Sequence, residues 1–222
     1  MRTWTLGLLL LPMTAFGGCS SSSSSTFAEP TPDAGGNLFG VGDGAVLGDG
    51  SAGAGCSDAA KLVYVLSEEK GLYSFNPGTL TFTQIGTLNC QTAATPNSMA
   101  VDRKGGAWVN YDDGKLYKVS TSDASCTSTS FQAGQGGFGK FGMAFSSDAP
   151  GSDAETLYVA SIPASGSAGG GKLAKIDLTT MTLTVLGSFT GTQKGQGAEL
   201  TGTGDARLFG FFTTQPAELA QV

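Results

Sequence analysis

The residues of this chain that could carry out chemistry are few, and their types restrict that chemistry. The 222-residue sequence contains no histidine, and only 14% of its residues are charged. Without histidine the chain cannot form a Ser-His-Asp or Cys-His catalytic centre, nor a metal site with an imidazole ligand. The formal net charge is −6, and no cluster of Lys or Arg marks a nucleic-acid surface. We therefore assign no catalytic residue, metal ligand or cofactor, and we expect no nucleic-acid partner.

Two stretches look superficially like reactive sites. Asp112 and Asp113 are adjacent carboxylates that could act as an acid–base pair, but Gly114 follows them directly. An Asp-Gly pair readily adopts the positive φ of a tight hairpin, so we predict a turn there. Residues 132–141 (QAGQGGFGKF) are rich in glycine, but they have neither the spacing of a phosphate-binding loop nor a helical pattern after them. They predict a plain loop.

Four cysteines, Cys19, Cys56, Cys90 and Cys126, are the other reactive side chains. No CxxC pair is present, which argues against a thiolate metal site. In an oxidising compartment a disulfide is expected. Cys90 and Cys126 lie near the outer strands of two successive repeats, so we predict this pair, with a stabilisation of roughly 3–4 kcal/mol. The alternative pair is Cys56–Cys90, which would tie the N-terminal segment to the first repeat.

Residues 1–18 predict a secretory signal peptide. Arg2 supplies a positive charge, a leucine-rich stretch follows, and small residues precede Cys19. The apolar stretch is too short to span a membrane. The FGGC sequence that ends at Cys19 resembles a bacterial lipobox, although Phe16 stands where that family usually has Leu. The resemblance implies that Cys19 is lipidated and begins the mature protein, and Ser20 implies the outer membrane. The alternative is an ordinary signal peptide with Cys19 incidental.

Residues 19–58 have the composition of a linker. An unbroken serine run at 20–25 is followed by Pro30, Pro32 and a segment rich in glycine, aspartate and alanine. Such a segment cannot bury enough apolar surface to offset the chain entropy lost on folding. We therefore expect a disordered tether between a lipid anchor and the folded domain.

Residues 59–222 contain a repeated pattern of short strands. Residues 98–120 predict three strands joined by two tight turns, and similar units recur along the chain. Each unit has a strand containing an aromatic residue and then a leucine followed three residues later by an apolar residue. These leucines are Leu72, Leu116, Leu173 and Leu219. Repeats of roughly 40–50 residues with about four short strands are typical of β-propeller blades.

The strands also indicate how complete the propeller is. Innermost strands are predicted at residues 99–101, 143–145 and 198–200, and outer strands at 80–88 and 183–189. The first unit has no innermost strand and the last has no outer strand. We therefore predict an all-β fold, a β-propeller with about three and a half four-stranded blades in an incomplete ring. This favours a truncated part of a larger propeller; the alternative is a four-bladed ring with an incomplete last blade.

The blade sequence resembles known propeller families. Residues 99–109 (MAVDRKGGAWV) and 114–119 (GKLYKV) are similar to NHL-type and SMP-30-type six-bladed propellers. The resemblance covers roughly residues 60–222 and implies the propeller fold. Lactonases of the SMP-30 group hold a divalent metal at the pore with acidic and Asn residues. That set has no position-by-position match here, so no catalytic residue is carried over.

The preferred functional hypothesis is a non-enzymatic lipoprotein of the cell envelope whose propeller binds or scaffolds an unknown protein or glycan. The membrane, reached through the lipid on Cys19, is the other expected partner. The ligand face is expected on one rim, formed by the loops at 89–98, 132–141 and 191–197. Two alternatives remain: a metal-dependent hydrolase or lactonase of SMP-30 type, and a truncated remnant with no function.

Overall fold

The computed structural model describes residues 57–163 and 171–222. Its strands form four antiparallel sheets, each built from strands that follow one another in the chain. The predicted signal peptide, the lipid site Cys19, Cys56 and nearly all of the predicted tether lie outside the described residues.

The first two sheets come from residues 63–128. The first sheet has the order β1 (Val63–Leu66), β2 (Gly71–Asn76) and β3 (Thr81–Thr87). The second sheet has the order β4 (Pro96–Val101), β5 (Gly106–Tyr111), β6 (Leu116–Ser120) and β7 (Cys126–Ser128). A short 3-10 helix, η1 (Asp58–Lys61), precedes β1.

The other two sheets come from residues 140–221. The third sheet has the order β8 (Lys140–Ser147), β9 (Glu155–Ile162), β10 (Lys172–Asp177) and β11 (Thr182–Ser188). The fourth has the order β12 (Ala198–Gly202), β13 (Leu208–Phe212) and β14 (Glu218–Gln221). Two further 3-10 helices lie in the loops before β8 and β12, η2 (Gln135–Gly137) and η3 (Gly191–Gln193).

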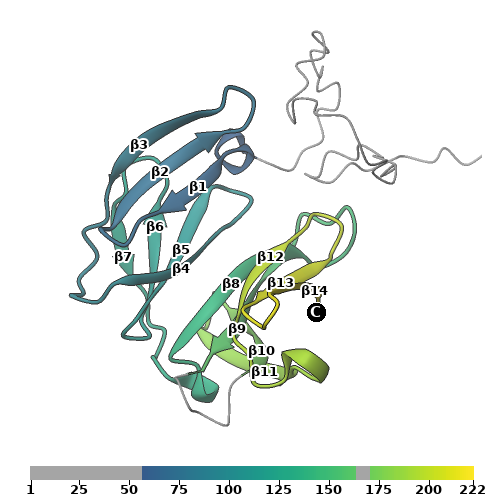
Figure 1. Cartoon of the computed structure of the whole chain (residues 1–222). Helices are drawn as coiled ribbons and strands as arrows, with labels where there is room; N and C mark the ends of the chain where they lie inside the picture. The colour runs from purple at the N-terminus through teal and green to yellow at the C-terminus, as the bar shows by residue number, and fades with distance from the viewer. Residues whose placement is uncertain (1–56, 164–170) are drawn as a thin grey trace, which may run out of the picture.

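The sheets are arranged like consecutive blades of a propeller (Figure 1). The first strands of the second, third and fourth sheets lie side by side, with β8 between β4 and β12. The first sheet starts with what would be the second strand of a blade, and the fourth stops, among the described residues, at the third. The predicted all-β propeller architecture and its two incomplete blades are therefore confirmed.

Local polar contacts explain the turns within the sheets. The Asn76 Oδ1 accepts the backbone N–H of Gly78 at 2.9 Å, and the Asp177 Oδ1 accepts that of Thr179 at 2.8 Å. Both are the Asx turns that their sequences predict, and each leads from the third to the fourth strand of a blade. Gly114 has a φ of +79°, as the predicted hairpin at Asp113-Gly114 requires.

Three apolar clusters lie between consecutive sheets and hold them together. Leu72 packs between the first and second sheets, and Leu116 between the second and third. Leu173 packs between the third and fourth. Each of these leucines lies opposite the end of the preceding strand, as the registers Leu66↔Leu72, Asn110↔Leu116 and Ala160↔Leu173 show. The recurrent leucine therefore occupies matching places in successive sheets, as the repeat predicts.

Candidate functional site

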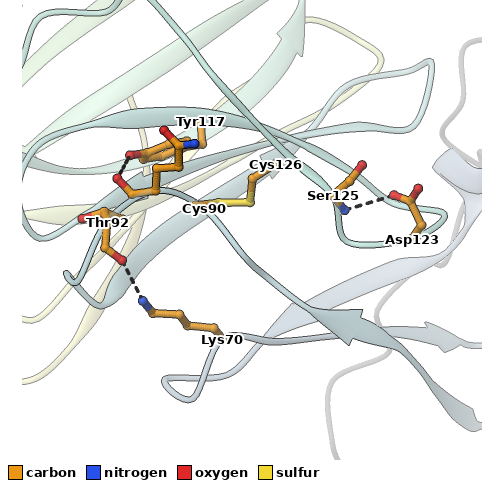
Figure 2. The surroundings of a disulfide bond; sticks show 8 residues. Lys70, Cys90, Thr92, Tyr117, Asp123, Ser125 and Cys126 are labelled. Atoms are coloured by element: carbon orange, nitrogen blue, oxygen red, sulfur yellow. Dashed lines mark hydrogen bonds between the residues drawn. A yellow bond between two sulfur atoms is a disulfide. The ribbon is translucent and has the colours of Figure 1, made fainter.

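Cys90 and Cys126 form a disulfide, the pair that the sequence favours over Cys56–Cys90 (Figure 2). Cys90 lies in the loop between β3 and β4, and Cys126 is the first residue of β7. The bond therefore ties the connection between the first two sheets to the outer edge of the second. Close by, the Lys70 Nζ donates to the backbone carbonyl of Thr92 at 3.1 Å. The disulfide and this hydrogen bond both hold the loop between β3 and β4.

Asp112 and Asp113 lie in the hairpin turn between β5 and β6. Asp113 accepts the backbone N–H of Lys115 at 3.1 Å and the hydroxyl of Thr92 at 2.7 Å. Burial alone would raise the pKa of Asp113, but the hydrogen bonds from Thr92 and Lys115 outweigh it and lower that pKa. Asp112 pairs with the Lys140 Nζ at 2.9 Å. Both carboxylates are engaged in structural contacts, as the turn prediction expects.

The three loops expected to bind a ligand connect the outer strand of one sheet to the inner strand of the next. They include residues 89–95, 129–139 and 189–197 and lie at the beginnings of β4, β8 and β12. One pocket of about 290 Å³ lies at the opposite ends of these inner strands. A second pocket of about 290 Å³ lies between the third and fourth sheets, where Thr190 and Gln193 of the 189–197 loop contribute to its lining. The first pocket is not on the rim that the sequence indicates, whereas the second includes residues of one of the three predicted loops.

All four sheets contribute to the first pocket, which we call the axial pocket. Its apolar wall is formed by Ala60, Leu62, Tyr64, Met99, Val101 and Phe145. Its polar wall includes Asp102, Arg103, Ser147, Glu155 and Thr203. A concave site with an apolar wall and a few convergent polar groups is the usual form of a ligand-binding site.

Two glycines allow the inner strands β8 and β12 to come together, Gly142 near their beginnings and Gly202 beside the axial pocket. A methyl group on Gly142 of β8 would overlap the carbonyl oxygen of Ala198, and one on Gly202 of β12 would overlap that of Phe145. The close backbone approach of the third and fourth sheets therefore requires glycine at both places. The Ser146 hydroxyl donates to the carbonyl of Arg207 at 3.1 Å across the same boundary.

Arg103 is the principal polar side chain of the axial pocket. Its backbone N–H donates to the Glu155 Oε1 at 2.9 Å, and its Nε lies 3.8 Å from the Glu155 Oε2. Its Nη2 donates to the hydroxyl of Ser147, and its Nη1 lies 3.9 Å from the Asp153 carboxylate. Only 12% of the Arg103 side chain is exposed. The guanidinium thus joins the second sheet to the third and is fixed by several partners.

The acidic residues of the axial pocket have distinct environments. Burial raises the pKa of Glu155, although the hydrogen bond from the Arg103 backbone opposes the rise. Asp102 accepts the backbone N–H of Gly106 at 2.7 Å and that of Lys104 at 3.0 Å. Asp102 therefore stabilises the first turn of its blade. In the fourth sheet the corresponding residue is Thr203, whose hydroxyl accepts the backbone N–H of Arg207 at 3.0 Å. Asp205, two residues later, accepts from the Thr203 hydroxyl and from the Arg207 Nε.

Farther along the axis, a serine links three inner strands. The Ser98 hydroxyl of β4 donates to the Glu199 Oε2 of β12 at 2.7 Å. It also accepts the backbone N–H of Met143 in β8 at 3.2 Å. Glu199 is exposed, yet the protein atoms around its carboxyl desolvate it and raise its pKa, against the effect of the Ser98 bond.

The polar groups that line the axial pocket include two carboxylates, a guanidinium and two hydroxyls. Among residues 57–163 and 171–222, no group of three or more His, Cys, Asp or Glu side chains is placed to hold a metal ion. The same residues contain no helix long and apolar enough to cross a membrane. The pocket offers hydrogen-bond donors and acceptors beside an apolar wall, which suits recognition of a polar group on a larger ligand.

Sequence reasoning does not identify Arg103, Glu155, Ser98 or Glu199. Ser98 and Glu199 occupy equivalent places in the inner strands β4 and β12, but the contacts of these four residues join positions between 44 and 101 apart in the chain. The available signal is weak: Arg103 follows Asp102 at the first turn of a blade, on the rim where the inner strands end. Trp108 and Tyr158 pack between the sheets.

No family model matches this chain, and no curated protein is similar to it in sequence. Among solved structures, a protein of unknown function from Bacteroides thetaiotaomicron is 14% identical, with a TM-score of 0.48 over 70% of this chain and 43% of its own. The Dos1 propeller is 13% identical, with a TM-score of 0.47 over 75% of this chain and 42% of its own.

A third solved structure, the dihydro-heme d1 dehydrogenase NirN, is 15% identical, with a TM-score of 0.43 over 76% of this chain and 35% of its own. This chain spans less than half the length of each of the three. The propeller-type fold is evident from the four sheets themselves, and likenesses of this strength add nothing about ligand or activity.

Proposed function

We propose that this chain is a binding module of the cell envelope, held to the outer membrane by a lipid on Cys19, whose axial pocket receives part of a larger ligand. The chemistry of the pocket fits a glycan end that carries hydroxyl groups beside an apolar ring face. The observation that carries this proposal is the convergence of all four sheets on one pocket with a fixed guanidinium, Arg103.

The size and lining of the axial pocket support the binding of one part of a larger ligand. Its volume of about 290 Å³ is at the lower end of small-molecule sites, which run from about 300 to 1,000 Å³. Tyr64 and Phe145 offer apolar surface, and Arg103, Ser147 and Thr203 offer polar groups close by. Because several of these polar groups already have partners, the ligand would add to an ordered network and not have to build one.

The anchor is supported by the sequence alone. The FGGC sequence ending at Cys19, the serine run after it and the leucine-rich segment before it fit a lipoprotein signal. Mass spectrometry of the mature protein tests this part of the proposal. A diacylated or triacylated Cys19 at the N-terminus is expected, and an unmodified N-terminus beyond Cys19 would overturn the anchor.

Binding is tested with two bulky substitutions, one on each rim. Ala60→Trp fills the axial pocket from η1, and Gln132→Trp places the same bulk in an exposed loop of the opposite rim. A microbial glycan array is probed with the wild type and both variants. We expect wild-type binding to be lost in Ala60→Trp and kept in Gln132→Trp. The reverse pattern would place the ligand on the loop rim, and no glycan binding by the wild type would overturn a glycan ligand.

A further inference from the structure

The hydrogen-bonding capacity that remains in the axial pocket is mostly that of an acceptor. Among the described residues that line it, Arg103 is the only one with a cationic side chain. Its guanidinium is engaged by the Ser147 hydroxyl and by the carboxylates of Glu155 and Asp153. The Thr203 hydroxyl donates within its own turn. The charged donor of the pocket is therefore committed to protein partners.

Two carboxylates of the lining each keep one oxygen without a strong donor among the described residues. The Asp102 Oδ1 accepts backbone N–H groups of its turn, whereas the Oδ2 has a long contact of 3.5 Å from the Trp108 Nε1. The Glu155 Oε1 accepts the Arg103 backbone N–H, whereas the Oε2 lies 3.8 Å from the Arg103 Nε, beyond hydrogen-bond distance. A ligand group that donates hydrogen bonds would fit these two oxygens.

The charge of the axial pocket favours a cation at the same place. Its lining carries two carboxylates and one guanidinium, which gives a formal charge of −1. Burial raises the pKa of Glu155 against the hydrogen bond from the Arg103 backbone, and the negative charge of Asp102 raises that pKa further. Each carboxylate thus disfavours the ionised form of the other, and a cation beside them would relieve that repulsion.

The apolar wall of the axial pocket suits a cation as well. Tyr64 of the first sheet and Phe145 of the third are its aromatic side chains. The face of an aromatic ring attracts an ammonium group through the quadrupole of the ring. The pocket therefore combines two negative acceptors with aromatic surface.

We infer that the part of the ligand in the axial pocket carries a primary ammonium group, which donates to the carboxylates of Asp102 and Glu155. Given the proposed function, on which this assignment rests, the glycan end is an amino sugar whose nitrogen is not acetylated. An ammonium group has three donors and no acceptor, which complements the two carboxylates. An N-acetyl group has no charge, and it brings a carbonyl acceptor to oxygens that are acceptors themselves.

Two trisaccharides that differ only in acetylation test this assignment. One is built of N-acetylglucosamine units and the other of glucosamine units with free amines. The full chain in detergent is titrated with each trisaccharide by isothermal calorimetry at neutral pH. We expect the free amine to bind roughly tenfold more tightly, because it gains charge-assisted hydrogen bonds.

Charge-removing variants locate the ammonium group. Glu155→Gln and Asp102→Asn each keep the oxygen that accepts backbone N–H groups. Each should lower the affinity for the free amine to that for the acetylated trisaccharide. Glu218→Gln is the matched control, because it removes one carboxylate charge at the beginning of β14 on the opposite rim. It should keep the preference of the wild type, and Ala60→Trp should bind neither trisaccharide.

Circular dichroism checks that each variant is folded. A wild type that binds both trisaccharides equally, or prefers the acetylated one, would overturn the ammonium group and leave a glycan ligand in place. Wild-type affinity for the free amine in Ala60→Trp, or in both Glu155→Gln and Asp102→Asn, would place the amine outside the axial pocket and also overturn the assignment. If neither trisaccharide binds, the ammonium group is overturned, and the glycan array decides the proposed function separately.

Discussion

Hydrogen bonds of single polar side chains near the axis join the sheets. The bond from the Ser98 hydroxyl to the Glu199 carboxylate is an example. The Ser98 hydroxyl contacts a carboxylate of the fourth sheet and a backbone N–H of the third. It thus connects strands that are far apart in sequence with one small side chain. The cost of this arrangement is the partial desolvation of the Glu199 carboxyl, which raises its pKa above the usual 4.5.

Replacement of Glu199 by glutamine should therefore change the pH dependence of stability. A raised pKa in the folded state means that the ionised carboxylate is disfavoured by folding, and this penalty is complete at pH values above the folded pKa. The penalty disappears as the pH falls toward 4.5, the usual value. We expect Glu199→Gln to unfold at a higher urea concentration than the wild type at neutral pH, with the difference shrinking toward pH 4.5.

Asp177→Asn is a control in which the pH dependence of the stability difference from the wild type should have the opposite sign. Hydrogen bonds from the backbone of Thr180 and Thr179 lower the pKa of Asp177, so its carboxylate stabilises the fold above 3.8, the usual value, and that stability is lost as the pH falls through the lower folded pKa. A Glu199→Gln variant that is less stable than the wild type at neutral pH would show that the Ser98 bond outweighs desolvation.

Arg103 should be important for stability as well as for the axial pocket. In Arg103→Met the guanidinium is lost, so Glu155, Ser147 and Asp153 lose its contacts while the apolar part of the side chain is kept. We expect a loss of about 1–3 kcal/mol in the free energy of unfolding, measured by urea denaturation. Glu155→Gln keeps an acceptor for the Arg103 backbone N–H and should lose less. Equal losses would mean that the charge pair with Glu155 accounts for the whole contribution of the Arg103 guanidinium.

At the scale of the strands, glycine permits the approach of the third and fourth sheets. Gly142→Ala would push a methyl group into the Ala198 carbonyl and should destabilise the fold by about 1–3 kcal/mol or more. A methyl group added at Gly187 of β11 would meet no neighbouring atom within 4 Å, so Gly187→Ala is the matched control. It should change stability by about 0.5 kcal/mol at most. Thermal unfolding of both variants checks this difference in stability. Similar unfolding midpoints would contradict the close approach of β8 to β12 at Gly142.

The disulfide connects elements that no sheet ladder joins. Its two cysteines are 36 residues apart, and closing such a loop restricts the unfolded chain and stabilises the fold by roughly 3–4 kcal/mol. The double variant Cys90→Ala/Cys126→Ala should lose about that much, and the wild type in reductant should behave like it. A wild type whose urea midpoint is unchanged by reductant would argue against the bond.

The elements are more predictable from the sequence than the site is. The Leu-x-x-apolar pattern and the Asx turns at Asn76 and Asp177 are local signals, and the structure confirms them. The outer strand of the second sheet escapes prediction, because β7 is only three residues long and lacks apolar alternation. The sequence indicates the loop rim and not the rim of the axial pocket, because the meeting of Arg103 with Glu155 depends on how the blades are rotated about the axis.

At the scale of the molecule, the described residues form an arc of four sheets, all of which contribute to the axial pocket. The predicted lipid at Cys19 would hold this arc near a membrane through a serine-rich tether. In that arrangement the axial pocket would be available to ligands in the envelope.

The central claim, that a ligand occupies the axial pocket, is tested most directly by photo-crosslinking in the cells that produce the protein. Ala60, which lines the pocket, and Gln132, in the loop of the opposite rim, are each replaced by benzoylphenylalanine in the full chain. After irradiation we expect a crosslinked glycan-bearing species from position 60 and none from position 132. Crosslinking from position 132 alone would contradict the claim and return the ligand to the loop rim.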